Sequence, residues 1–140
     1  MEKFELSLDY SEIDFLKTSL EVILNRQLNS IAKKKVWLKE NEKKMKSLGE
    51  KVKAGKSGIF RNHKDKLQEL SEKRKDVHAK LDKNKRIHKR AKSIYLKILN
   101  LIYKNDPDHI ELIKENEIFL ADDREQPYKD FYRKWDKTFF

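Results

Sequence analysis

The 140-residue sequence contains no cysteine, only three glycines and only two prolines. The absence of cysteine excludes disulfide bonds and thiolate metal sites, and it suits a reducing compartment. A β-sandwich or β-barrel needs many more turn residues, so an all-β fold is not expected. No apolar run approaches the roughly 20 residues that a membrane span requires. We therefore expect a soluble, cytoplasmic protein that does not enter a membrane.

Charged residues outnumber apolar ones in this chain. Hydrophobic residues make up 37% of the sequence and charged residues 41%. That balance suits long helices with narrow apolar seams, because each helix then exposes most of its circumference. The length allows one domain but not two well-packed cores. We predict an all-α fold in which residues 1–140 form a single domain.

Two long segments show the three- and four-residue spacing of apolar side chains that is typical of helices. They predict one helix over about 12–50, with Ser11 as its N-cap, and a second over about 59–105. All three glycines lie between residues 49 and 58, which marks the reversal of the chain. Each helix then buries its seam against the other, in a coiled-coil-like antiparallel helical hairpin over 11–105.

Polar residues interrupt the apolar seam of the first helix. The three- and four-residue spacing predicts apolar side chains near three positions that are polar, namely Gln27, Lys34 and Asn41. They thin the contact between the two helices, and a thin hairpin buries little surface on its own. Self-association is therefore a further expectation.

The two ends of the chain differ from the hairpin. Residues 1–10 alternate apolar and polar side chains, which predicts an extended lead-in, either alone or as a short strand paired with Ile118–Leu120. Residues 106–140 predict two short helices packed at the base of the hairpin: one at about 108–121 and one that begins at Pro127. The last helix has an aromatic face that we expect to pack against the hairpin or a second subunit, with base stacking as the alternative; it consists of Tyr128, Phe131, Tyr132, Trp135 and Phe139.

The net charge of +10 is unevenly distributed. Residues 26–105 contain 26 Lys/Arg and eight Asp/Glu, an excess of 18 positive charges. Residues 1–25 and 106–140 each carry a net charge of −4. A basic middle between acidic ends creates a field with a direction, which indicates a polyanionic partner.

The basic middle of the hairpin is the candidate nucleic-acid-binding surface. Folding the hairpin about residue 54 predicts that Lys33–Lys35 lie opposite Lys73–Lys75. Lysine outnumbers arginine there, and lysine favours point-charge contacts with phosphate over bidentate recognition of bases. The candidate residues are Lys33, Lys34, Lys35, Lys43, Lys44, Lys46, Lys53, Lys56, Arg61, Lys64, Lys66, Lys73, Arg74, Lys75, Arg86, Lys89 and Arg90.

The predicted function is that of a non-catalytic accessory protein that grips the phosphate backbone of RNA or DNA with little sequence specificity. The alternative is a protein-binding adaptor or inhibitor, of the kind that phages and mobile elements encode. Such a protein inserts its basic hairpin into an acidic surface, or into the nucleic-acid channel, of a larger protein or ribonucleoprotein complex. Affinity for free nucleic acid separates the two interpretations.

No motif indicates an enzyme, a cofactor or a metal site. The histidines His63, His78, His88 and His109 lack metal-ligand spacing. The segment 49–57 has five residues between its glycines where a phosphate-binding loop has four, and no strand precedes it. Asp122, Asp123 and Glu125 cluster in a predicted turn, where capping a helix or pairing with the basic residues is the simpler role.

Overall fold

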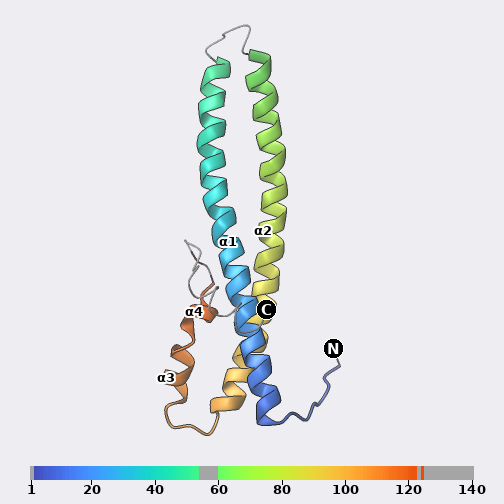
Figure 1. Cartoon of the computed structure of the whole chain (residues 1–140), viewed down its shortest axis with the longest axis vertical. Helices are drawn as coiled ribbons and strands as arrows, with labels where there is room; N and C mark the ends of the chain where they lie inside the picture. The colour runs from blue at the N-terminus through green and yellow to red at the C-terminus, as the bar shows by residue number, and fades with distance from the viewer. Residues whose placement is uncertain (1, 54–59, 123, 125–140) are drawn as a thin grey trace. The chain divides into compact units, whose positions relative to one another are not determined.

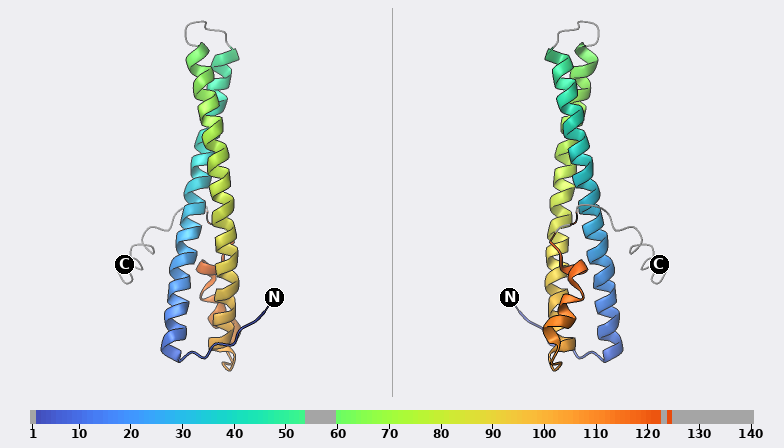
Figure 2. Two further views of the ribbon diagram at one scale, coloured as in Figure 1. Left: turned by 90° about the vertical axis from the view of Figure 1, so that its right-hand side faces the viewer. Right: turned by 90° about the vertical axis from the view of Figure 1, so that its left-hand side faces the viewer.

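The computed structural model describes residues 2–53, 60–122 and 124, and within them the regular secondary structure is entirely helical (Figure 1). The long helices are α1 (Tyr10–Lys53) and α2 (Phe60–Tyr103), and the short ones are α3 (His109–Lys114) and α4 (Glu117–Leu120). α1 and α2 pack against each other in opposite directions, so the predicted all-α helical hairpin is confirmed. Figure 2 shows the same two helices from the sides, where their upper parts overlap in the view.

The contacts divide the chain into two compact units. Among the described residues, unit 1 consists of 2–27 and 87–122, and unit 2 consists of 28–53, 60–86 and Arg124. Each unit contains a portion of α1 and a portion of α2, and each has its own small hydrophobic cluster.

The N-terminus of α1 is capped by Asp9 rather than by Ser11. The backbone N–H of Glu12 donates to Asp9 Oδ1 at 2.8 Å, and the backbone N–H of Asp9 donates to Glu12 Oε1 at 3.2 Å. This reciprocal pair is a capping box, which satisfies two backbone donors at once. Ser11 lies inside α1, which already begins at Tyr10, so it is not the N-cap that the sequence predicted.

The N-terminal segment does not form the paired strand, which was one of its two predicted alternatives. Residues 2–9 have no regular secondary structure, and Ile118–Leu120, their suggested partner, lie in α4. The Phe119 backbone N–H donates to the Asn116 carbonyl at 3.0 Å, and that of Ala121 donates to the Glu117 carbonyl at 2.9 Å. These backbone groups are used inside a helical turn, and a single short strand without a partner is not stable.

Unit 1 packs α3 and α4 against the hairpin. Its core contains five buried residues from α1, α2 and α4: Leu24, Ala91, Tyr95, Leu99 and Phe119. The rings of Tyr95 and Phe119 meet edge to face, with centroids 6.0 Å apart and planes at 74°. This edge-to-face contact joins α4 to α2 and adds to the free energy of burial.

The segment 108–121 forms two short helices instead of the single helix predicted there. α3 ends at Lys114, and Asn116 precedes α4. The Asn116 side chain donates to the Leu112 carbonyl at 2.9 Å, and its Oδ1 lies 3.1 Å from the Tyr95 hydroxyl. The Asn116 side chain therefore provides a hydrogen-bond donor to a carbonyl of α3 at the break, and it also contacts the core residue Tyr95. The helix predicted from Pro127 lies outside the described residues.

Unit 2 has a thinner core than unit 1. Ile31, Leu38 and Leu81 are its buried cluster, with Trp37 and Val77 packed against them. Polar residues occupy much of the remaining seam, as the sequence predicts for Lys34 and Asn41. Asn41 is only 2% exposed, although it is polar.

The register of unit 2 differs from the predicted one by about one helical turn. Ser30 Oγ lies 3.3 Å from Asn84 Oδ1, and the Arg74 side chain contacts the Leu38 carbonyl. The predicted register instead placed Ser30 near residue 78. Because α1 contains Gly49 and continues to Lys53 while α2 begins at Phe60, the midpoint between the two helices falls later in the chain than residue 54. Gly55 and Gly58 lie outside the described residues.

Candidate nucleic-acid interface

The two units carry opposite net charges. In unit 2, residues 28–53 and 60–86 contain 19 Lys/Arg and eight Asp/Glu, an excess of 11 positive charges. In unit 1, residues 2–27 and 87–122 contain nine Lys/Arg and 12 Asp/Glu, an excess of three negative charges. The basic residues are thus concentrated in one compact unit, and a field of one sign results there.

Most of the candidate binding residues have exposed side chains. In unit 2 the exposed candidates come from both helices: Lys33, Lys43, Lys44, Lys46, Lys53, Lys64, Lys66, Lys73, Lys75 and Arg86. Lys89 and Arg90 are exposed as well, but they belong to unit 1. Lys56 and the side chain of Arg61 lie outside the described part of the chain, as do the five aromatic residues of the candidate association face.

The lysine triplets do not meet as predicted. Under the observed register Lys34 interacts with Lys80, and the pKa of Lys34 is lowered first by partial burial and then by the positive charges of Lys80 and Lys33. Its Nζ donates to Ser30 Oγ at 2.5 Å, so Lys34 is part of the seam. The prediction that Lys33–Lys35 lie opposite Lys73–Lys75 is therefore wrong.

Arg74 crosses the seam instead of facing solvent. Its Nη1 donates to the Leu38 carbonyl at 3.1 Å and to Asn41 Oδ1 at 3.3 Å. Asn41 in turn donates to the Leu70 carbonyl at 3.5 Å. This set of contacts joins α1 to α2 through polar groups, and it orients the guanidinium inward.

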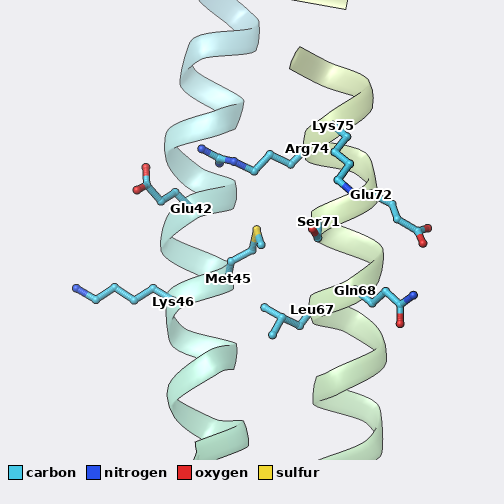
Figure 3. A pocket seen from close by; sticks show the side chains of 9 residues that line it. All are labelled: Glu42, Met45, Lys46, Leu67, Gln68, Ser71, Glu72, Arg74 and Lys75. Atoms are coloured by element: carbon cyan, nitrogen blue, oxygen red, sulfur yellow. The ribbon is translucent and has the colours of Figure 1, made fainter. Parts of the chain in front are cut away.

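A groove next to Arg74 runs between α1 and α2 and has a volume of about 750 Å³ (Figure 3). Met45 and Leu67 point toward one another across it, and Arg74 reaches toward α1 above them. Its charged lining mixes both signs, since Glu42 and Glu72 accompany Lys46, Arg74 and Lys75. A polyanion would meet carboxylates as well as cations there.

A second groove of about 460 Å³, lined by other residues of α1 and α2 in unit 2, is more uniformly basic. Leu48 and Leu70 are the apolar residues of its lining, and both are half-buried. Four exposed lysines surround them: Lys44 and Lys51 from α1, and Lys66 and Lys73 from α2. The acidic residue in the lining is Glu69, which pairs with Lys73 at 3.6 Å on the same helix.

Lys51 is missing from the candidates named from the sequence, although its spacing identifies it. Lys44 and Lys51 are seven residues apart on α1, and Lys66 and Lys73 are seven apart on α2. Seven-residue spacing keeps side chains in line along a coiled-coil helix. A count of the lysines in each segment does not detect this alignment. Assigning the residues of both helices to heptad positions does.

Unit 1 neutralises part of its own basic charge. Lys92 Nζ lies 2.7 Å from Asp122 Oδ1, and this hydrogen bond lowers the pKa of the Asp122 carboxyl, with the charge of Lys92 as the next cause. Asp122 therefore pairs with a basic residue of the hairpin, as suggested for the acidic cluster. Asp123 and Glu125 lie outside the described residues.

The histidines occupy separate positions. His88 is buried, His63 is half-buried and His78 is exposed. The Nδ1 atom of His109 lies 2.9 Å from the Tyr103 carbonyl. Across residues 2–53, 60–122 and 124, no cluster of three or more His, Asp or Glu side chains is placed to hold a metal ion. In the same residues, no helix has the length and apolar character to cross a membrane.

Comparisons with protein-family models, with curated proteins and with solved structures found no match to this chain.

Proposed function

We propose that unit 2 binds the phosphate backbone of nucleic acid, as a non-catalytic accessory protein of the cytoplasm. The observation that carries this function is the gathering of exposed lysines on both helices of a single compact unit, whose residues 28–53 and 60–86 have an excess of 11 positive charges. Each lysine that neutralises a phosphate releases counterions, so such a surface gains affinity without reading the base sequence.

The chemistry of the side chains favours phosphate over bases. Lysine is a point charge on a flexible stem, whereas bidentate recognition of guanine needs the planar fork of arginine. Arg74 uses its guanidinium inside the seam, where it contacts Leu38 and Asn41. Little sequence specificity follows, and either RNA or DNA suits the surface.

The repulsion within unit 2 supports a bound polyanion. Partial burial is the main cause of the lowered pKa of Lys34, and the positive charges of Lys80 and Lys33 lower it further. Like charges at such separations cost stability at low salt, and phosphates that neutralise them remove part of this cost. Nucleic acid should therefore stabilise the folded chain as well as bind to it.

The test is a titration of the full chain against labelled single- and double-stranded RNA and DNA of about 20 nucleotides, at several salt concentrations. We expect submicromolar binding at low salt, with log affinity falling linearly against log salt concentration. The slope counts the phosphates that are neutralised, at about 0.9 per phosphate for duplex DNA.

Charge reversal identifies the unit that binds. The triple variant Lys33→Glu, Lys43→Glu, Lys64→Glu changes three exposed residues of unit 2 and should reduce both the affinity and the slope. The matched control reverses three exposed lysines of unit 1, namely Lys97, Lys104 and Lys114. Equal losses in both variants would show that only the net charge matters. No binding of the unmodified chain to any of the four nucleic acids would rule out the function and leave an acidic protein partner as the alternative.

A further inference from the structure

We propose that the groove lined by Lys44, Lys51, Lys66 and Lys73 binds an acidic amphipathic helix, as a third helix beside α1 and α2. This groove is called the lysine groove below. The inference rests on its apolar lining, on the spacing of its lysines and on the near absence of acidic groups around it. It does not depend on the proposed binding of nucleic acid.

Leu48 and Leu70 give the lysine groove an apolar interior. Both are half-buried, so part of each side chain is left uncovered by the pairing of α1 with α2. Phosphate groups gain nothing from such a surface, whereas the apolar stripe of an amphipathic helix buries it. This feature favours a helix over nucleic acid as the occupant of the groove.

The lysines are spaced as a neighbouring helix requires. Lys44 and Lys51 are separated by seven residues, as are Lys66 and Lys73, which is about 10 Å along each helix. In the heptad repeat of the seam, where Leu38 and Met45 occupy one core position, Lys44 and Lys51 directly precede a core residue. This flanking position forms the salt bridges between helices in coiled coils. A third helix with acidic residues at its own flanking positions presents carboxylates at the same seven-residue interval, on both sides of its apolar stripe.

The charge around the lysine groove is left largely uncompensated by its own lining. Four lysines line it from two sides, and Glu69 is the acidic residue among them. Like charges that face one another across two helices are unfavourable, and carboxylates between them reverse the sign of the interaction. The Met45–Leu67 groove differs, because Glu42 and Glu72 already accompany its cations. It therefore provides an internal control.

Three of the four lysines, Lys44, Lys66 and Lys73, also belong to the candidate phosphate-binding surface. A docked acidic helix would cover them, so the helix and nucleic acid should compete for unit 2. Competition is measurable only if both bind, whereas the docking of the helix can be measured alone.

The test uses the full chain and a labelled synthetic peptide of three heptads, with Leu at the two core positions of each heptad and Glu at the two flanking positions. One matched peptide replaces the Leu residues by Ser and keeps the charge. Another replaces the Glu residues by Lys. By fluorescence anisotropy, we expect the acidic amphipathic peptide to bind at least about tenfold more tightly than the Ser peptide, and the Lys peptide not to bind.

Two double variants locate the peptide. The variant Lys44→Glu with Lys73→Glu should weaken peptide binding at least about tenfold. The control variant, Lys46→Glu with Lys75→Glu, changes the charge of the Met45–Leu67 groove by the same amount. It should weaken peptide binding about twofold or less. Circular dichroism checks that both variants keep the helical content. The inference is overturned if the Ser peptide binds as tightly as the Leu peptide, if both variants lose binding equally, or if the acidic peptide does not bind.

These outcomes are separate from those of the nucleic-acid titration. A chain that binds the Leu peptide but no oligonucleotide supports the helix site and contradicts the proposed function. A chain that binds oligonucleotides and treats both acidic peptides alike has a general polyanion surface and no helix site.

Discussion

The hydroxyl of Tyr95 donates a hydrogen bond to Glu21 Oε2 at 2.8 Å, and this contact joins α2 to α1 inside unit 1. Tyr95 is fully buried and Glu21 is 4% exposed, so a carboxylate lies within the hydrophobic core. Lys17 approaches the same oxygen at 3.2 Å from one turn earlier on α1. A buried carboxylate requires such partners, because its desolvation is otherwise costly.

Removing the Tyr95 hydroxyl should destabilise the protein. Tyr95→Phe preserves the ring and its contact with Phe119 but leaves Glu21 with one hydrogen bond fewer. The expected loss is about 1.5–3 kcal/mol in the free energy of unfolding, the range for hydrogen bonds to charged groups. Urea denaturation followed by circular dichroism measures it. Tyr10→Phe is the control, since Tyr10 is 74% exposed; equal effects of the two changes would contradict a role for the buried hydroxyl.

The same tyrosine predicts a loss of stability at alkaline pH. Burial raises the pKa of Tyr95 above the 10.0 of a free tyrosine, and the charge of Glu21 and its hydrogen bond raise it further. The unfolded chain releases this proton above about pH 10 while the folded chain retains it. Stability from this group is therefore complete below pH 10 and declines as the pH rises beyond it.

The size of this decline is at most about 1.4 kcal/mol per pH unit, the value for one proton. Unfolding free energies of the unmodified chain and of Tyr95→Phe, measured between about pH 9 and about pH 11, should converge as the pH rises. The difference between the two chains removes the contribution of the lysines, which titrate in the same range. A constant difference across the series would show that Tyr95 ionises as readily in the folded chain as in the unfolded one.

The capping box at the start of α1 predicts different effects for two neighbouring residues. Asp9→Ala removes the acceptor for the Glu12 backbone N–H and should cost about 1 kcal/mol of stability. Ser11→Ala lies inside the helix and should be neutral or slightly stabilising, because alanine has the higher helix propensity. Thermal unfolding of the two variants makes the comparison. A larger loss for Ser11→Ala would restore Ser11 as the cap.

The polar contacts across the unit 2 seam predict a non-additive pair of substitutions. Arg74→Leu leaves the buried Asn41 Oδ1 without the guanidinium and should cost about 1–3 kcal/mol. Combining it with Asn41→Leu replaces both polar partners by apolar ones and should recover or exceed the original stability. A double-mutant cycle by chemical denaturation measures the coupling. Additive losses would mean that Arg74 and Asn41 act independently.

The double variant also tests what the polar seam does. Buried polar residues can set the register and the number of helices in a coiled coil, at a cost in stability. Sedimentation of the double variant should then reveal new oligomers that the unmodified chain does not form. A single unchanged species would limit the seam to a contribution to stability.

Much of the fold follows from local patterns. Helical spacing predicted both long helices to within a few residues at each end, since an amphipathic stripe many turns long leaves few alternatives. The charge segregation was visible in the sequence, but the boundary between the units falls inside the basic segment, because residues 87–105 belong to unit 1. The N-cap at Ser11 and the single helix over 108–121 were predicted wrongly, and the paired-strand alternative for residues 1–10 is not formed. The first two depend on single side chains, Glu12 at the cap and Asn116 between α3 and α4, which compete with the local pattern.

Composition and periodicity alone determined that this chain is helical, that its helices pair through thin seams, and that its middle is basic. Those properties depend on averages over many residues. Only the tertiary structure decided the register, because a shift of one turn keeps the apolar stripes in contact and changes which polar residues meet. That shift places Arg74 beside Asn41, Lys34 near Lys80, and four lysines around Leu48 and Leu70. The lysine groove follows from pairing between distant segments, which no local pattern specifies.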